Sequence, residues 1–194
     1  MYSFFAMMAR MKYIERWALM RNSMQENISE HSLEVAMLAH GLAIISNEKC
    51  GGSLDVSKIA LMGLYHDANE IITGDMPTPV KYYDDDIRDA YKRVENVASH
   101  TLINKLPDYM QKYYQPLFFQ QEEEKEAWRI VKAADKLSAL IKCMEELRTG
   151  NQEFATAEET TKKALREMNM PEVEIFMKEF LPAYERTLDE LQSK

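Results

Sequence analysis

Apolar side chains along this chain recur at the three- and four-residue spacing of an α-helix, and the alternating pattern typical of strands is rare. Glycines, prolines and capping residues divide the pattern into about seven main helical pieces. We expect them over residues 4–20, 27–47, 55–74, 87–107 and 122–150 and on either side of Pro171, with shorter helical material around 109–118. The sequence therefore predicts an all-α fold.

The second piece is predicted to be a buried helix. Asn27-x-x-Glu30 is a capping box, in which the two side chains satisfy free backbone donors at the start of a helix. A helix that is apolar nearly all round is expected to be buried. One of its faces carries Leu33, Met37, His40 and Ile44, and another carries Val35, Leu38 and Leu42.

The third piece is predicted to begin at Asp55, which is suited to cap a helix, and to end at Gly74. Its apolar positions are Ile59, Leu61, Met62, Leu64 and Ile71. Residues 73–79 are expected to form an ordered loop, because two prolines remove backbone donors and disfavour the helical conformation before them.

Two later helices have clear apolar stripes. The fourth is marked by Ile87, Tyr91, Val94, Ala98 and Leu102 and is stopped by Pro107. Acidic residues at 122–124 favour the start of the fifth, whose stripe is Ile130, Ala134, Leu137, Ile141 and Met144. No repeat, low-complexity segment or linker interrupts the pattern, so residues 1–194 are expected to form one domain.

Composition and charge exclude several classes of protein. With 24 Lys and Arg against 32 Asp and Glu, the chain of 194 residues has a formal charge of −8, which argues against a nucleic-acid polymer as partner. Apolar runs such as 35–39 are much shorter than the ~20 residues of a membrane span. Two distant cysteines, Cys50 and Cys143, and no leader segment indicate a cytoplasmic protein. The glycines form neither a dinucleotide-binding nor a P-loop motif.

Four residues on three predicted helices are suited to bind one metal ion. They are His31, the consecutive pair His66 and Asp67, and Asp135. Two imidazoles and two carboxylates suit a transition metal such as Mn, Fe, Co, Ni or Zn. Taken singly, each has an ordinary alternative role, since a lone histidine is usually a core residue and an acid between two lysines usually faces solvent. We assign His40 and His100 that ordinary role.

The order His31, then His66-Asp67, then Asp135 resembles the H…HD…D signature of the HD-domain metal-dependent phosphohydrolases. Further segments resemble the bacterial HD-domain 5′-deoxynucleotidases over nearly the whole chain. They include Glu26 to Ser32, Tyr65 to Glu70 and the loop Thr73-Gly74-Asp75-Met76-Pro77-Thr78-Pro79. The T-G-D-x-P-T-P loop after H-D-A-x-E is the most specific of these. The sequence departs from the pattern at Asn69, where a smaller residue is expected.

This resemblance implies a single-domain HD-type helical bundle, with a metal-site core at about 27–145. It also implies hydrolysis of deoxyribonucleoside 5′-monophosphates to deoxyribonucleoside and phosphate. The implied metal ligands are His31, His66, Asp67 and Asp135, with Co or Mn as the favoured metals. The other residues implied to contact substrate, together with Asp67 and Asp135, are Arg16, Trp17, Asp75, Met76, Pro77 and Thr78.

Two roles follow from the charges involved. Two carboxylates cancel the charge of a divalent metal, so a phosphate dianion needs a further cation, and Arg16 can supply it in a bidentate contact. The leaving 5′-alkoxide needs a proton, which either Glu70 or Asp75 can donate, and we favour Glu70. The ordinary alternatives are a solvent-facing Glu70 and a surface Arg16.

Selection of deoxyribose requires a wall that penalises a 2′-hydroxyl. Trp17 facing Pro77 and Thr78 can form that wall, and burying an unpaired hydroxyl costs ~1–3 kcal/mol. The alternative is that Trp17 is a core anchor on an amphipathic helix. No Asn or Gln pair is placed to recognise a base edge, so weak base discrimination is expected.

Two other functions remain open from the sequence. One is an HD phosphohydrolase for a different phosphate ester, such as a nucleoside triphosphate, a cyclic nucleotide or a guanosine tetraphosphate. Longer polyphosphates would call for more cations than Arg16, Arg21 and Lys81. The other is a non-catalytic helical interaction module with structural histidines, which would bind no stoichiometric transition metal.

The resemblance also implies a homodimer. Apolar residues of the late helices offer a surface for it: Leu165, Met168, Phe176, Met177, Phe180, Leu181 and Tyr184. The alternative is that these residues close the core of the monomer.

Overall fold

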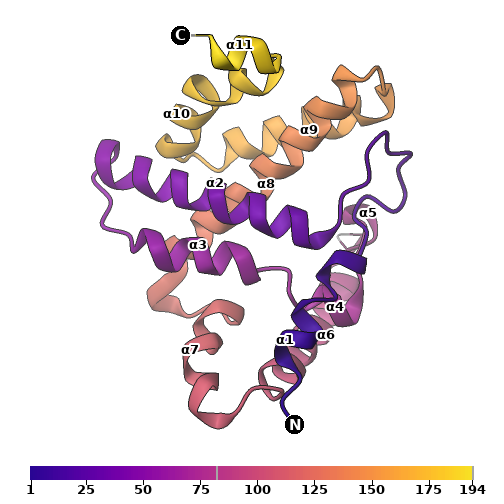
Figure 1. The fold of residues 1–194 in the computed structure, drawn as a ribbon, viewed down its shortest axis with the longest axis vertical. Coiled ribbons are helices and arrows are strands. Elements are labelled where there is room, and N and C mark those ends of the chain that lie inside the picture. Colours follow the sequence, from indigo (N-terminus) through magenta and orange to yellow (C-terminus); the bar gives the residue numbers. More distant parts are fainter. Residues whose placement is uncertain (82, 194) are drawn as a thin grey trace.

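A computed structural model of the chain describes residues 1–81 and 83–193. Within these residues the regular structure is helical, apart from an isolated antiparallel β-bridge between Glu15 and Asn27 (Figure 1). The α-helices are α1 (Phe4–Met8), α2 (Ile28–Lys49), α3 (Val56–Tyr65), α4 (Glu70–Thr73), α5 (Thr78–Lys81), α6 (Asp85–Ile103), α7 (Asp108–Phe118), α8 (Lys125–Arg148), α9 (Ala155–Glu167), α10 (Pro171–Glu179) and α11 (Leu188–Gln192). Short 3₁₀ turns lie at Met11–Tyr13, Glu122–Glu124, Gln152–Phe154 and Leu181–Glu185.

The long helices α2 and α8 cross at the centre of the molecule and form its core together with α3, α9 and α10 (Figure 1). Helices α2 and α3 approach closely because Gly63 has no side chain, and a Cβ there would lie 3.0 Å from Ala36 Cα. The predicted stripe of α8 is confirmed, since Ile130, Ala134, Leu137 and Ile141 are buried and Met144 packs against them. Helices α1, α4, α5 and α6 form a separate group beside this core (Figure 1).

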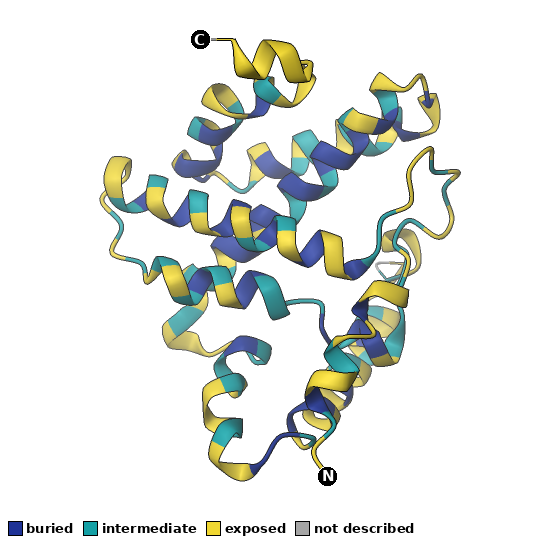
Figure 2. Ribbon diagram, viewed as in Figure 1, coloured by how far each residue is buried: buried dark blue, intermediate teal, exposed yellow. Residues whose placement is uncertain are grey.

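One face of α2 is exposed, so the prediction of an all-round buried helix is wrong. Val35, Leu38 and Leu42 are buried, but Leu33 and Met37 are 55% and 61% exposed. His40 and Ile44 on the same face are also exposed. Figure 2 shows exposed segments that recur along α2. The neighbours of α2 within the described residues pack on its other sides, which apolarity of the sequence alone does not reveal.

The predicted first helix over residues 4–20 is also wrong beyond Met8. Phe4 anchors α1 in a small cluster with Leu102. After the 3₁₀ turn the chain is extended, and it pairs through backbone hydrogen bonds from Arg16 N to Glu26 O (2.9 Å) and from Ile28 N to Ile14 O (3.0 Å). Pairing with a distant segment has overridden local helix propensity.

The predicted helix 55–74 is divided into α3 and α4 by a turn at residues 66–69, and the remaining helices follow the predictions with small shifts at their ends. Loop 73–79 is shorter than expected, because Thr78 and Pro79 begin α5, where a proline in the first turn loses no helical hydrogen bond. The last segment also contains a 3₁₀ turn and α11, which were not expected. No helix among the described residues has the length and apolarity needed to span a membrane.

Candidate active site

Helix α2 places His31 in the interior. Its capping box is present, with the Asn27 side chain accepting from Glu30 N at 3.1 Å and the Glu30 side chain accepting from Asn27 N at 3.3 Å. His31 lies one turn after Asn27 and is fully buried. The capping box therefore determines the residue at which α2 begins, and so it places His31 at a buried position of the helix.

His66 and Asp67 lie in a turn, not within the predicted single helix 55–74. Helix α3 ends at Tyr65, and α4 begins at Glu70. His66 Nδ1 donates to the Gly63 carbonyl at 2.7 Å, which satisfies one of the free carbonyls at the end of α3. Leaving the helix lets the two consecutive side chains reach the same point.

The structure brings His31, His66, Asp67 and Asp135 together. One ligand atom from each lies within 4.8 Å of the others. His31 Nε2 is 3.4 Å from Asp67 Oδ2 and 3.2 Å from Asp135 Oδ1, and His66 Nε2 is 3.1 Å from Asp67 Oδ2. The Nε2 atoms of both histidines are buried and have no hydrogen-bond partner. Unpartnered nitrogens facing two carboxylates fit a divalent transition metal.

The electrostatics of this cluster favour a cation. Burial opposes protonation of His66, but Asp67 and Asp135 outweigh it and raise the pKa of His66 to about 10. The pKa of His31 is also raised, against the effects of burial and Arg16. The two imidazoles hold the pKa values of both carboxyls well below their usual range, although burial acts the other way. The same charges that favour a proton on these nitrogens would favour a divalent cation, which would bind in competition with the protons.

Arg16 and Trp17 reach this cluster from the irregular segment between the 3₁₀ turn Met11–Tyr13 and α2. Arg16 Nη1 lies 3.5 Å from Asp67 Oδ2, and Arg16 Nε donates to Glu26 Oε2 at 3.1 Å. Trp17 Nε1 donates to the same Glu26 oxygen at 2.8 Å, and its ring contacts Phe154 at 5.4 Å between centroids. Arg16 is not the surface residue of its ordinary alternative, since its side chain is only 11% exposed. Trp17 does not lie on a helix, but its contact with the buried Phe154 also fits the role of a core anchor.

The loop that follows Trp17 is fastened to α8 by Glu146. Ser23 N and Met24 N donate to the Glu146 carboxylate at 2.8 and 3.2 Å. Lys142 Nζ donates to that carboxylate at 2.6 Å, and both side chains are buried. A buried ion pair thus holds the chain between Trp17 and Glu26 in one position.

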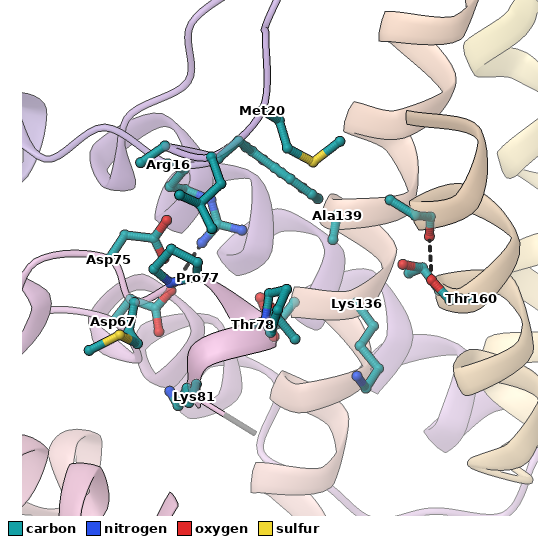
Figure 3. Close-up of a pocket in the computed structure, with 18 of the residues that line it drawn as sticks. Arg16, Met20, Asp67, Asp75, Pro77, Thr78, Lys81, Lys136, Ala139 and Thr160 are labelled. Carbon is teal, nitrogen blue, oxygen red and sulfur yellow. Dashed lines mark hydrogen bonds and ion pairs between the residues drawn. The ribbon is translucent and has the colours of Figure 1, made fainter. Parts of the chain in front are cut away.

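A cavity of about 710 Å³ opens beside the cluster. Arg16, Asp67 and Asp75 lie at one end, and Lys136 and Thr160, from α8 and α9, lie at the other (Figure 3). All the residues implied to contact substrate line it, since Trp17, Met76, Pro77, Thr78 and Asp135 belong to its wall. The remaining predicted ligands, His31 and His66, lie behind that wall.

Glu70 and Asp75 also line this cavity. Glu70 is only 5% exposed, and its Oε2 has no hydrogen-bond partner. Burial, with the nearby charges of Asp67 and Asp75, raises the pKa of Glu70 to about 9. Burial also raises the pKa of Asp75. Glu70 is therefore not the solvent-facing side chain of its ordinary alternative, and it carries a proton at neutral pH.

Sequence comparison decides the family. A model of the family described as "5′-deoxynucleotidase YfbR-like" matches residues 3–184. The chain belongs to the YfbR-like 5′-deoxynucleotidase family. It is 48% identical to 5′-deoxynucleotidase VP0926 of Vibrio parahaemolyticus over 188 residues, 97% of each chain. It is 47% identical to the 5′-deoxynucleotidase of Erwinia tasmaniensis over 191 residues, 98% of this chain and 96% of the relative.

Solved structures show the HD-domain fold. An HD-domain phosphohydrolase from Listeria innocua gives a TM-score of 0.82 at 24% identity and covers 94% of this chain and 88% of its own. The cyanophage S-2L HD phosphohydrolase DatZ, bound to dA and one catalytic Zn²⁺ ion, gives 0.65 at 20% identity over 94% and 96%. The predicted all-α HD fold and the enzyme class, a phosphoric monoester hydrolase of the 5′-deoxynucleotidase type, are confirmed.

Glu26 is the residue that sequence reasoning missed. In the sequence it is only one residue of the segment 26–32, yet one of its oxygens accepts from both Arg16 and Trp17. Spacing along the chain gives no signal for this contact, because it depends on the pairing of residues 14–16 with 26–28. His40 and His100 lie on the surface, so the expectation of two core histidines is wrong.

Proposed function

We propose that this enzyme hydrolyses deoxyribonucleoside 5′-monophosphates at the cluster of His31, His66, Asp67 and Asp135, with a divalent metal held by these four residues. The observation that carries the proposal is the pair of buried, unpartnered Nε2 atoms facing two carboxylates beside an arginine. When bound there, a divalent metal supplies Lewis acidity, which lowers the pKa of water and polarises a phosphate oxygen. Mixed nitrogen and oxygen ligation suits Co or Mn, and also Fe, Ni or Zn.

The protein's own residues bind and orient the substrate. Arg16 contacts the phosphate, because its guanidinium points at Asp67 and is only 11% exposed. Glu70 donates the proton to the leaving 5′-oxygen, and Asp75 is the alternative donor at the same end of the cavity. Trp17 and the residues from Met76 to Thr78 belong to the same cavity wall and would lie along the sugar.

The remainder of the cavity receives the nucleoside. Ala139, Ala157 and Thr160 are among its lining residues, and such small side chains offer few groups able to distinguish one base from another. This composition supports weak base discrimination. Its lining cations among the described residues are Arg16, Lys81 and Lys136, and Lys81 is already paired with Glu95. This small number of cationic side chains suits a monophosphate better than a polyphosphate.

A phosphate-release screen tests this function. Purified protein, stripped and reloaded with Mn, Co or Zn, is assayed against all nucleoside 5′-mono-, di- and triphosphates in ribo and deoxy forms. We expect metal-dependent release from deoxyribonucleoside monophosphates with a preference for deoxy over ribo substrates. Faster release from triphosphates, or activity without any metal, would contradict the proposal.

Asp135→Ala is expected to lose both bound metal and the thermal stability that the metal confers. A metal shared by separate elements binds only the folded state, so it raises the apparent stability by an amount that grows with the logarithm of its affinity. The measurements are the metal content and the rise in Tm on metal addition. Glu145→Ala, which changes an exposed carboxylate on the same helix, is the control. Equal metal content in the two variants would remove Asp135 from the ligand set.

Glu26→Ala is expected to weaken deoxyribose selection. Trp17 has a φ of 60°, in the left-handed region that bulky residues rarely adopt, so its placement depends on its contacts. Losing a hydrogen bond to a charged group costs ~1.5–3 kcal/mol, or roughly 10- to 100-fold. We expect a fall of that order in kcat/KM for dAMP, and a smaller dAMP-to-AMP ratio. Glu26→Gln should rescue in part, since the amide oxygen still accepts.

The control for Glu26→Ala is Glu15→Ala, which changes an exposed glutamate in the segment that pairs with residues 26–28 and forms the β-bridge with Asn27. If both glutamate variants show the parent's dAMP-to-AMP ratio, Glu26 does not position Trp17.

We also infer a homodimer, but on a different surface from the one first expected. Of the seven apolar residues expected to form the dimer surface, Leu165, Phe176 and Leu181 are buried in the core of the monomer. Among the seven, only Phe180 and Tyr184 are exposed. The exposed apolar face of α2, formed by Leu33, Met37 and Ile44, is the better candidate.

Sedimentation is expected to give twice the chain mass of 22.6 kDa at micromolar concentration. Met37→Glu should shift that mass towards the monomer, because it places a charge within an apolar contact. Tyr109→Glu, at an exposed aromatic residue on α7, should not. A parent mass near 22.6 kDa would contradict the dimer.

A further inference from the structure

The hydrogen-bonding state of His31 determines whether it can bind a metal. Its ring is fully buried, and Nε2 faces Asp67 and Asp135 without a hydrogen-bond donor or acceptor assigned to it. A neutral imidazole carries its proton on one nitrogen only, and a metal needs the other. The group that contacts Nδ1 therefore decides which nitrogen is free.

That group is Ser138, on α8 and one turn after Asp135. Its Oγ lies 3.0 Å from His31 Nδ1, and it is fully buried. The same Oγ donates to Glu34 Oε2 at 2.5 Å. Glu34 follows His31 by one turn of α2, so both helices that supply the cluster also supply this chain of contacts. The next acid near Nδ1 is Glu26, whose Oε1 is 4.0 Å away, beyond hydrogen-bonding distance.

Counting hydrogens fixes the direction of each bond. A serine hydroxyl has one hydrogen, and Ser138 donates it to Glu34 Oε2. The hydroxyl hydrogen is therefore used on Glu34, and Ser138 Oγ can only accept from His31. The proton of His31 must then lie on Nδ1, which leaves the lone pair of Nε2 directed at the cluster.

We propose that Ser138 and Glu34 form a relay that holds His31 in its Nδ1-protonated form and so prepares Nε2 to bind the metal. The proposal rests on the metal site proposed above. His66 is held in the same Nδ1-protonated form by a backbone acceptor, because its Nδ1 donates to the Gly63 carbonyl. No side-chain substitution removes that carbonyl. Ser138 and Glu34 are thus positioning residues that touch neither substrate nor metal, and a fixed second contact of this kind typically changes metal affinity 10- to 100-fold.

Zinc affinity measured by chelator competition tests the relay. Ser138→Ala is expected to bind Zn²⁺ about 10- to 100-fold more weakly than the parent. Ser32→Ala is the matched control, because Ser32 is also fully buried, is next to His31, and its Oγ has no partner. Its affinity should equal the parent's. Equal zinc affinity in Ser138→Ala and Ser32→Ala would overturn the relay.

A double-mutant cycle tests whether Glu34 acts through Ser138. Glu34→Gln should weaken zinc binding, because an amide can donate to Ser138 and reverse the hydroxyl. Adding it to Ser138→Ala should cause little further loss, since the intermediate hydroxyl is already absent. Fully additive losses would show separate roles and overturn the relay. Glu34 is only half-buried, so Glu34→Gln is expected to fold. Its zinc affinity still tests the relay if Ser138→Ala fails to fold.

Nuclear magnetic resonance of zinc-loaded protein labelled with ¹⁵N at histidine gives a readout independent of activity. The Nδ1 proton of His31 should have a hydrogen-bonded, downfield resonance in the parent and lose that position in Ser138→Ala. The resonance of the His66 Nδ1 proton should have the same chemical shift in the parent and in Ser138→Ala, so it serves as an internal control. An unchanged His31 resonance would overturn the relay, whereas a parent that binds no zinc would overturn the metal site itself.

Discussion

Arg16→Ala is expected to reduce turnover of deoxyribonucleoside 5′-monophosphates by ~10²–10³-fold, with metal content unchanged. The carboxylates of Asp67 and Asp135 cancel a divalent charge, so a bound phosphate dianion leaves a negative charge that only a further cation offsets. Arg16 is the cation nearest to this position, and Glu26 holds its Nε so that the guanidinium faces the cluster. Each tenfold loss in rate corresponds to ~1.4 kcal/mol of lost transition-state stabilisation.

Two further variants define what Arg16 contributes. Arg16→Lys should recover only part of the rate, because it keeps the charge but not the planar fork. Arg21→Ala should keep the parent rate, since Arg21 lies in the same loop but its side chain is 86% exposed. Steady-state kinetics and metal analysis of all three decide the matter. A parent rate in Arg16→Ala would remove this residue from the mechanism.

Glu70→Ala is expected to bind metal and deoxynucleotide but to hydrolyse the substrate ~10²–10⁴-fold more slowly. The leaving 5′-alkoxide is a strong base, and a carboxyl whose pKa is about 9 still holds a proton at neutral pH. Asp75→Asn is the comparison, because Asp75 lines the same cavity and its pKa is raised as well. If Asp75→Asn loses more rate than Glu70→Ala, the donor is Asp75.

The raised pKa of Glu70 also predicts the pH dependence of stability in metal-free protein. Folding raises the pKa from 4.5 to about 9, so the folded state holds this proton more tightly than the unfolded chain. The resulting stabilisation is complete below pH 4.5 and is lost as the pH rises to about 9. Glu70→Gln cannot ionise, and its Tm should fall less than the parent's between pH 5 and pH 9. Parallel Tm profiles would contradict the raised pKa.

The sequence determined the helical fold, and most of its boundaries, through local interactions. The capping box at Asn27 and the apolar stripe of α8 act within one or two turns, so their effect is visible from spacing alone. It also contained the four residues of the cluster in an order that indicates their chemistry. Motif order along the chain is enough to identify residue types, although it says nothing about the distances between them.

Tertiary structure decided which surfaces are covered and how the site is oriented. Leu33 and Met37 are as apolar as Val35, and only the position of neighbouring helices leaves them exposed. Arg16 leaves its predicted helix because its backbone pairs with Glu26, ten residues away. His66 leaves α3 because its ring satisfies a carbonyl at the helix end. Each outcome depends on contacts between segments that are distant in sequence or on the competition at a helix end, and local propensity and periodicity carry no information about either.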